Sequence, residues 1–267
     1  MRIGLIGCGT VGGVLKTWFQ EKTRHELFTR DLAKGYNDQF PAKLDAVFIS
    51  IPVPVSKSGQ DLRVLEHAVH VAKFHSDNVF LRSTVLPGTN DKLGTHAMPE
   101  FLTERTAQKD FDEQETLIVG GWPIGKDPNI LFELFAGKKE IEFVSNTEAE
   151  LIKYTHNCFG AMKVTYFNII KDLCLKYGAE YDEVKKYSML TGFIEPTHTQ
   201  VPGPDGKRGY AGKCFPENIE TMRNMLFSNP DFKKSKIPYF FQMIKLLNDD
   251  FRNEDVRRDE ELSAQTI

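Results

Sequence analysis

The sequence predicts an α/β fold, with an N-terminal doubly wound, mostly parallel sheet followed by an α-helical domain with a long central helix. Three observations lead to this prediction. Short apolar strands alternate with helix patterns in the first half, a glycine-rich turn follows the first strand, and residues 147–176 contain no helix breaker except Gly160. A chain of 267 residues can form two domains, which we place at residues 1–145 and 146–267.

The first domain is predicted from six short strands with helices between them. Residues 46–52 (AVFISIP) are continuously apolar, as in a parallel strand that is buried on both faces. The other strands are predicted at 2–7, 25–30, 79–82, 116–120 and 140–144, and the helices at 14–22, 62–74 and 128–135. This alternation predicts a parallel sheet with helices on both faces.

The second domain is predicted to begin with a long helix. Thr147 and Glu150 have the spacing of a capping box. An apolar stripe at helical spacing follows, made of Leu151, Tyr154, Cys158, Met162, Thr165, Ile169 and Leu173. A helix of roughly 30 residues measures about 45 Å, so we expect it to pack on both domains or on a second subunit, and we predict a homodimer formed through it. We interpret residues 197–212, rich in Gly and Pro, as a mobile loop, and predict helices at 216–227 and 237–251.

Composition and charge exclude several classes of partner. The chain has 40% hydrophobic residues, 27% charged residues and a net charge of −3, so no nucleic-acid partner is expected. No run approaches about 20 apolar residues, and the N-terminus lacks a signal-peptide layout, so we expect no membrane span and no secretion. Four cysteines without a CxxC pair indicate thiols in a reducing cytoplasm. His67 and His70 have no third ligand near them in the sequence, so no metal is predicted.

The turn GCGTVG is the strongest local signal for a ligand. Its first glycine permits a tight turn, its second lets the backbone approach a pyrophosphate, and its third lets the helix pack against the strand. We therefore predict a Rossmann-type site for NAD formed by Gly7, Gly9, Thr10, Val11 and Gly12. Asp31, 19 residues after Gly12, is placed to hold the ribose hydroxyls. Arg30, next to Asp31, leaves NADP as an alternative cofactor. The motif could instead be a structural glycine turn, and Asp31 could be an acidic residue of a turn.

One cysteine has the surroundings of a reactive thiol. Cys214 lies just before a predicted helix that has Pro216 in its first turn, and Lys213 is adjacent. The helix dipole and the lysine are expected to lower the thiol pKa and favour the thiolate, a nucleophile. The alternative is a small buried apolar residue. We interpret Cys8, Cys158 and Cys174 as structural.

Lys153 and Asn157 share a face of the long helix, separate from the apolar stripe. On spacing alone, such a face is most often solvated.

Six motifs in order resemble the UDP-glucose/GDP-mannose dehydrogenase family, the NAD-dependent nucleotide-sugar 6-dehydrogenases. They are GLIGCGTVG, IPVPVSKSGQDL, RSTVLPGT, MPEFLTERTAQKDF, TEAELIKYTHNCFGAMKVTYFNIIKDLC and VPGPDGKRGYAGKCFPENI. The resemblance implies a four-electron oxidation in two steps. A sugar C6 alcohol is oxidised to an aldehyde, which a cysteine captures as a thiohemiacetal; a second hydride loss gives a thioester, and water releases the uronic acid.

The resemblance also implies roles for individual residues. Cys214 matches the nucleophile, and Lys153 and Asn157 match the helix pair that stabilises the oxyanion and positions water. Glu100 and Glu104 match acid–base carboxylates, while Thr84 matches a hydroxyl that holds the water and the nicotinamide. The remaining matches are Pro52 in the cofactor loop and, for substrate binding, Phe101, Leu102, Gly209, Tyr210 and Gly212 together with Lys153 and Asn157.

The chain departs from the family pattern at several points. Asn218 stands where the family has an Asp, which puts thioester hydrolysis in question, and Met98 and Val53 replace a family Asn and Thr. The chain stops about where a second nucleotide-binding domain begins in the family, so we interpret it as a short form. UDP-glucose is the favoured substrate, ahead of GDP-mannose and UDP-N-acetyl sugars. Two alternatives are a hydroxyacid-type dehydrogenase that uses Lys153 for one hydride transfer, and a non-catalytic NAD-binding remnant.

Overall fold

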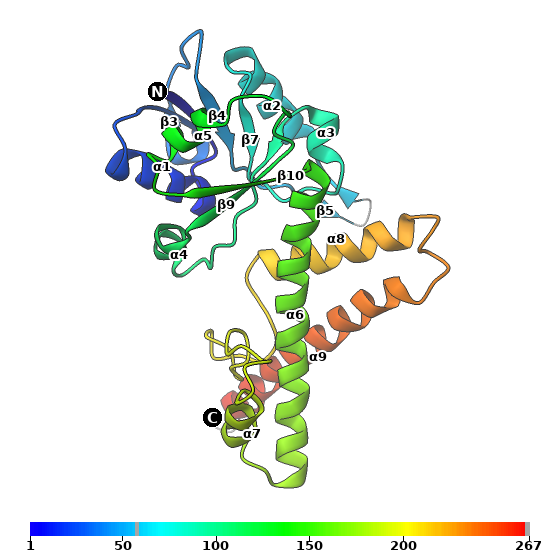
Figure 1. Cartoon of the computed structure of the whole chain (residues 1–267). Helices are drawn as coiled ribbons and strands as arrows, with labels where there is room; N and C mark the ends of the chain where they lie inside the picture. Colours follow the sequence, from blue (N-terminus) through cyan, green and yellow to red (C-terminus); the bar gives the residue numbers. More distant parts are fainter. Residues whose placement is uncertain (57–58, 265–267) are drawn as a thin grey trace. The chain divides into compact units, whose positions relative to one another are not determined.

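The structure, a computed structural model, describes residues 1–56 and 59–264 (Figure 1). The chain forms two compact units. Unit 1 contains Met1–Ser56 and Gln60–Lys153, and unit 2 consists mainly of the chain from Tyr154 onward. The predicted class, an N-terminal doubly wound sheet followed by a helical part with a long central helix, is confirmed.

Unit 1 is built on a six-stranded sheet in the order β3-β2-β1-β4-β7-β8, in which every neighbouring pair except β2–β3 is parallel. The strands are β1 (Arg2–Ile6), β2 (Glu26–Asp31), β3 (Tyr36–Asn37), β4 (Ala46–Ile49), β7 (Val79–Leu81) and β8 (His96–Ala97). Two short pairs accompany it, parallel β9 (Thr116–Gly120) with β10 (Glu140–Val144), and β5 (Val55–Ser56) with β6 (Gly59–Gln60). Lys57 and Ser58, part of the motif IPVPVSKSGQDL, lie outside the described residues.

Helices cover both faces of this sheet (Figure 1). They are α1 (Thr10–Lys22), the 3-10 turn η1 (Leu32–Lys34), α2 (Arg63–His75), α3 (Thr89–Leu93), α4 (Ala107–Glu113) and α5 (Asn129–Leu134). Strand β4 shows why the run 46–52 is apolar throughout. Phe48 packs in the core that contains Phe19 of α1, whereas Val47 and Ile49 pack in the opposite core, with Leu65 of α2.

The observed strand order places the topological switch point of the sheet at the carboxyl end of β1. The chain passes from β1 to β2 on one side and later to β4 on the other, so the winding reverses there. Ligands of doubly wound sheets bind at such a switch point. Strand β4 ends at Ile49, three residues earlier than predicted, because the Ile51 amide bonds the Ser83 hydroxyl instead of a neighbouring strand (N–Oγ 3.1 Å).

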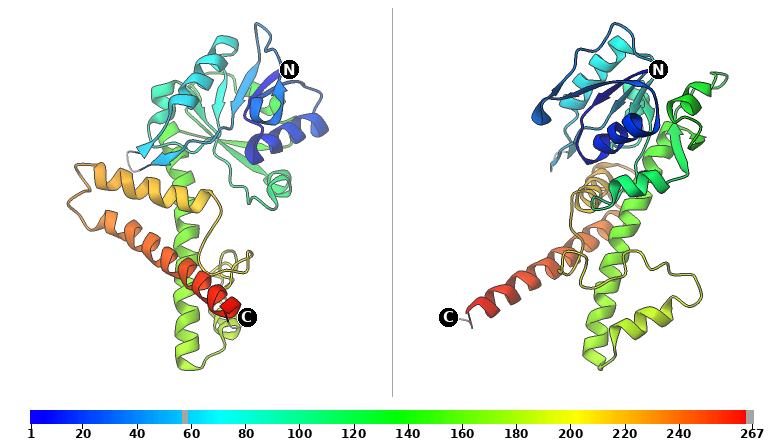
Figure 2. Two further views of the ribbon diagram at one scale, coloured as in Figure 1. Left: turned by 180° about the vertical axis from the view of Figure 1, so that it is seen from behind. Right: turned by 90° about the vertical axis from the view of Figure 1, so that its left-hand side faces the viewer.

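Unit 2 is helical. Its elements are α6 (Asn146–Tyr177), which begins in unit 1, and α7 (Tyr181–Ser188), α8 (Cys214–Ser228) and α9 (Ile237–Ala264). Helix α6 has 32 residues, or about 48 Å, and α8 and α9 lie side by side (Figure 2). A Cβ on Gly160 would lie 2.5 Å from Phe215 Cζ, so this glycine lets the start of α8 pack against α6.

Three features of the helices differ from the expectations or were absent from them. The capping box at the start of α6 is formed by Ser145 and Glu148, whose side chains bond each other's backbone N–H, and not by Thr147 and Glu150. The apolar stripe is buried or half-buried from Tyr154 to Thr165, but Leu151 before it and Ile169 and Leu173 after it are exposed. Helix α7 escaped prediction because it is short and polar, with Tyr181 as its buried side chain.

The predicted domain boundary between residues 145 and 146 coincides with the start of α6, whereas compactness assigns the first part of that helix to unit 1. The division into an NAD-binding domain and a substrate domain stays a prediction.

Candidate active site

The glycine turn of unit 1 has the geometry of a phosphate cradle. Gly7 adopts φ +86°, where its added Cβ would meet the Ser50 carbonyl oxygen at 2.4 Å, and a Cβ on Gly12 would lie 1.8 Å from the Gly7 carbonyl oxygen. A Cβ on Gly9 would meet nothing within 4 Å. The packing of the backbone thus requires glycine at positions 7 and 12. Gly9 is not required by packing, and it keeps the start of α1 open to a ligand.

Asp31 lies at the end of β2 beside this turn. Its carboxylate accepts a hydrogen bond from the Cys8 amide (N–Oδ2 2.7 Å). The acid is therefore fixed next to the glycine turn, where a ribose would lie. Thr10 and Val11 form the first turn of α1, whose N-cap is Gly9 and has no side-chain cap.

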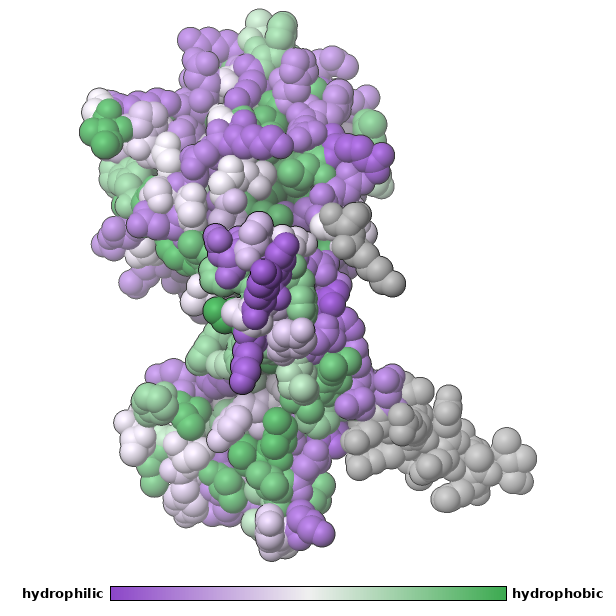
Figure 3. All heavy atoms as spheres, turned by 90° about the vertical axis from the view of Figure 1, so that its right-hand side faces the viewer, coloured by the Kyte–Doolittle hydropathy of each residue, from purple (hydrophilic) through white to green (hydrophobic). Residues whose placement is uncertain are grey.

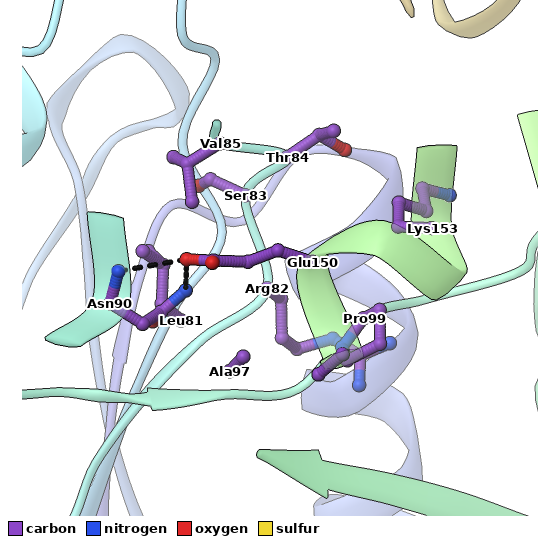
Figure 4. A pocket seen from close by; sticks show the side chains of 11 residues that line it. Leu81, Arg82, Ser83, Thr84, Val85, Asn90, Ala97, Pro99, Glu150 and Lys153 are labelled. Atoms are coloured by element: carbon purple, nitrogen blue, oxygen red, sulfur yellow. Dashed lines mark hydrogen bonds between the residues drawn. The ribbon is translucent and has the colours of Figure 1, made fainter. Parts of the chain in front are cut away.

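Thr84 and Lys153 line one small cavity in unit 1 (Figure 4). Glu150, one turn before Lys153 on α6, points into this region and accepts hydrogen bonds from the Gly88 amide (2.5 Å) and the Asn90 amide and side chain (both 2.8 Å). Glu150 therefore does not cap α6 as predicted and has a different structural role. It fixes α6 to Gly88 in the loop after β7 and to Asn90 in α3, and hence Lys153 relative to Thr84.

Lys153 and Glu100 form a buried ion pair. The Lys153 ammonium lies 2.8 Å from Glu100 Oε1 and also donates to the Glu100 carbonyl oxygen, and the two side chains are 5% and 6% exposed. Burial alone would raise the pKa of Glu100, but the Lys153 charge and hydrogen bond, the Leu102 amide and Arg82 together lower it. The interpretation of Lys153 as part of a solvated face is wrong.

Replacing Lys153 by methionine should cost about 3–5 kcal/mol at pH 7, because it leaves the Glu100 carboxylate buried without its partner. The pKa of Glu100 is lowered in the native protein, so the pair stabilises above the unfolded carboxyl pKa and is lost as pH falls through the folded one. In the Lys153→Met variant, burial raises the pKa of Glu100. The difference in free energy of urea unfolding between the native protein and the variant should therefore be largest at pH 7 and shrink toward pH 4.

Lys109→Met is the matched control, since the Lys109–Glu113 pair is exposed, 3.8 Å apart, and worth less than about 1 kcal/mol. A Lys153→Met protein as stable as the native one, or a gap independent of pH, would contradict the assignment.

Arg82, the residue before Ser83 and Thr84, is a further buried cation that sequence reasoning missed. It is 2% exposed, lies over the Phe111 ring at 5.6 Å, and its guanidinium has no hydrogen-bond partner within the described part of the chain. Burial lowers its pKa to about 10, so it stays charged at pH 7. Its charge helps hold Glu100 ionised.

Unit 2 contains three more of the predicted catalytic residues, Asn157, Cys214 and Asn218. Asn157, one turn after Lys153 on α6, is 3% exposed and donates to Asn218 (Nδ2–Oδ1 3.2 Å), which is 4% exposed. Cys214 is the first residue of α8, and Asn218 follows it by about one turn. Cys214 is exposed, whereas the other three cysteines are buried, so the alternative of Cys214 as a buried apolar residue is wrong.

The remaining predicted residues differ in exposure. Glu104 and Pro52 are exposed, and Phe101 and Leu102 are half-buried, with the Phe101 ring 5.5 Å from the Lys153 ammonium. Of the predicted substrate residues in unit 2, Gly209 and Tyr210 are buried and Gly212 is exposed. Their roles stay predictions.

The described residues contain neither a membrane-spanning helix nor a cluster of metal ligands. Among them, no helix is long and apolar enough to cross a membrane. Within the same ranges, no three His, Cys, Asp or Glu side chains gather as they would around a metal ion.

The chain is similar in sequence to known nucleotide-sugar dehydrogenases. Residues 147–232 match the model of the UDP-glucose/GDP-mannose dehydrogenase family, central domain. The UDP-glucose 6-dehydrogenase of Rhizobium meliloti (strain 1021) is 31% identical over 215 residues, which is 72% of this chain and 47% of that protein. The chain is therefore similar to the UDP-glucose/GDP-mannose dehydrogenase family over 72% of its length, and residues 147–232 match the central domain of that family.

Solved structures of this family share the fold. A UDP-glucose dehydrogenase from Pyrobaculum islandicum superposes with a TM-score of 0.74 at 19% identity, covering 93% of this chain and 68% of that one. A UDP-D-ManNAc dehydrogenase from Pyrococcus horikoshii superposes with a TM-score of 0.77 at 20% identity, covering 100% and 73%. The chain spans about half the length of the family members that it matches in sequence.

Proposed function

We propose that the chain is an NAD-dependent nucleotide-sugar dehydrogenase that oxidises a C6 alcohol to a carboxylic acid through a cysteine thioester, with UDP-glucose as the favoured substrate. The observation that carries the proposal is the buried Lys153 ammonium held by Glu100, with Asn157 one turn further along the same helix. A rigid ammonium and an amide donor suit an alkoxide that develops during hydride loss. GDP-mannose and UDP-N-acetyl sugars are the next candidates.

The residues of the glycine turn fit NAD. Gly9 leaves the approach to the α1 amides open, and the Asp31 carboxylate is fixed beside them for the ribose hydroxyls. When bound, NAD⁺ accepts the hydride from the sugar carbon. The protein's own part is to hold the phosphates with the uncapped amides at the start of α1 and to orient the ribose with Asp31.

Gly9→Ala tests this cradle without disturbing the fold. Gly9 has φ −65°, which alanine adopts freely, and its Cβ would point into open space. NAD affinity should fall at least tenfold while the melting temperature stays within about 2 °C, because the methyl group occupies the phosphate approach. Calorimetric titration with NAD⁺ measures the first quantity and a thermal scan the second.

Gly13→Ala is the control, since its Cβ would lie 3.6 Å from the Cys8 carbonyl oxygen, an ordinary contact inside α1. It should raise the melting temperature, because alanine is favoured over glycine by about 1 kcal/mol in a helix, and should leave NAD affinity unchanged. Equal NAD affinities for Gly9→Ala and the native protein would contradict a dinucleotide site here.

The chemistry proceeds through protein side chains in a fixed order. Lys153 and Asn157 stabilise the alkoxide as the C6 hydroxyl loses its proton and the carbon loses a hydride. The Cys214 thiolate then adds to the aldehyde carbon, and the oxygen takes up a proton to give a thiohemiacetal. Loss of a second hydride and that proton leaves a thioester. Water attacks it, breaks the C–S bond, and yields the acid and the thiol.

The long helix also supports the predicted homodimer. Phe159, Tyr166 and Leu173 recur every seven residues along α6 and are 58%, 54% and 46% exposed. A heptad of exposed apolar side chains suits a second copy of the same helix. Figure 3 shows apolar side chains gathered over unit 2 around α6 and α7.

The decisive experiment mixes the protein with NAD⁺ and UDP-glucose and counts NADH per sugar, with GDP-mannose and UDP-N-acetylglucosamine in parallel. The proposal expects two NADH per acid formed. One NADH with free aldehyde would favour the single-hydride alternative. NAD binding with no NADH from any of these sugars would favour a non-catalytic protein. A reducing compartment such as the cytoplasm keeps the required thiol active.

A further inference from the structure

The loop between α7 and α8 is held to its neighbouring helices by a buried arginine. Arg208 is 7% exposed, and its guanidinium donates to Asp172 of α6 (2.7 Å). It also donates to the side-chain and main-chain oxygens of Asn168 (both 3.4 Å) and lies over the Phe251 ring at 4.6 Å. A planar guanidinium can pair, bond and stack at once, which an ammonium cannot.

Two asparagine side chains accept hydrogen bonds from the next two residues of the loop. The Gly209 amide donates to Asn168 Oδ1 of α6 (3.2 Å), and the Tyr210 amide donates to Asn248 Oδ1 of α9 (2.6 Å). The asparagines are 1% and 7% exposed. Consecutive backbone amides are thus fixed by side chains from two helices, with Arg208 adjacent.

The backbone at this point requires a glycine. Gly209 has φ +71°, and an added Cβ would meet Asn248 Oδ1 at 2.6 Å. One turn beyond Asn248, Arg252 donates to the Arg208 carbonyl oxygen (3.1 Å) and to Asp205 (2.8 Å). The fixed segment leads directly to Ala211, Gly212 and the start of α8 at Cys214.

We propose that Arg208 is a positioning residue for the sugar of the nucleotide-sugar substrate: anchored by Asp172 and Asn168, it fixes Gly209 and Tyr210 so that the segment before Cys214 has one shape. This inference rests on the proposed function, because Gly209 and Tyr210 are predicted to bind a nucleotide-sugar substrate only through the resemblance to the family. It extends that function by assigning sugar recognition to a loop conformation that side chains of α6 and α9 hold in place. The loop loses its conformational entropy when the protein folds and not when the sugar binds. The substrate therefore binds more tightly than it would to a disordered loop.

The test uses Arg208→Gln, Arg208→Lys and Asp172→Asn in the full chain. Hydrogen exchange of the Gly209 and Tyr210 amides should accelerate at least tenfold in Arg208→Gln and less in Arg208→Lys. KM for UDP-glucose should rise at least tenfold with kcat changed less than threefold, and the Kd for NAD⁺ should stay within twofold. Asp172→Asn keeps an acceptor at a half-exposed position, so it folds even if Arg208→Gln does not, and should raise KM several-fold.

Lys186→Gln is the matched control, because Lys186 is an exposed cation on α7 in the same unit and its side chain lies over the Tyr187 ring (5.1 Å), outside the loop. Unchanged exchange and KM in both Arg208→Gln and Asp172→Asn would overturn the proposal, as would equal losses of NAD⁺ and UDP-glucose affinity. If the native protein oxidises no nucleotide sugar, the proposed function fails, and the role toward a substrate fails with it. The exchange rates would still show whether Arg208 fixes the loop.

Discussion

Replacing Cys214 by serine is expected to reduce acid formation at least about a thousandfold while NAD affinity stays unchanged. A thiolate adds to an aldehyde and leaves from an acyl group far more readily than a serine hydroxyl, so the second hydride loss has no covalent intermediate to start from. Product analysis by mass spectrometry, together with NADH counting, measures the effect. The variant should release a trace of aldehyde and about one NADH per sugar.

The other cysteines provide the controls for this experiment. Cys174→Ala should lower the melting temperature, because Cys174 is buried in the core of unit 2, but should keep acid formation. Iodoacetamide should modify Cys214 first, since burial raises the pKa of Cys8 to about 11 and that of Cys158 to about 12. Full acid formation by Cys214→Ser would refute the thioester route.

Replacing Asn218 by aspartate is expected to accelerate release of the acid about a hundredfold, the usual contribution of a general base. Asn218 is an amide and cannot take a proton from water, so the native protein should release two NADH in a rapid first turnover and then stall as a thioester. An aspartate keeps the acceptor that Asn157 now bonds and adds the missing charge. Stopped-flow measurement of the burst and the steady state, with mass spectrometry of the acyl-enzyme, separates the steps.

Asn218→Ala removes the side chain without adding a base. It should keep the slow phase of the native protein and lose stability, because it leaves the buried Asn157 amide without this acceptor. The interpretation of Asn218 is wrong if the native protein shows no burst, or if the aspartate variant turns over at the native rate.

Much of the fold was predictable because its signals are local. The run 46–52 is apolar on both faces, which identifies a buried strand. The glycine turn is recognisable because its backbone geometry requires glycine at fixed positions of one short segment. Helix α6 was predictable because nothing in 147–176 except Gly160 opposes a helix. Its cap was predicted two residues too late, because Ser145–Glu148 and Thr147–Glu150 share one spacing and only the neighbours of Glu150 decide between them.

The sequence by itself determined the longer strands, the long helix α6, the glycine turn, the position of Cys214 at a helix start and, through its motifs, the resemblance to the family. Tertiary structure alone decided that Lys153 and Asn157 are buried and not solvated, that Glu150 bonds the loop after β7, and that Arg208 anchors the segment before Cys214. Helical spacing states which residues share a face but not what covers that face. Burial, and with it the charge state of Glu100 beside Lys153, depends on residues about 50 positions away in the chain.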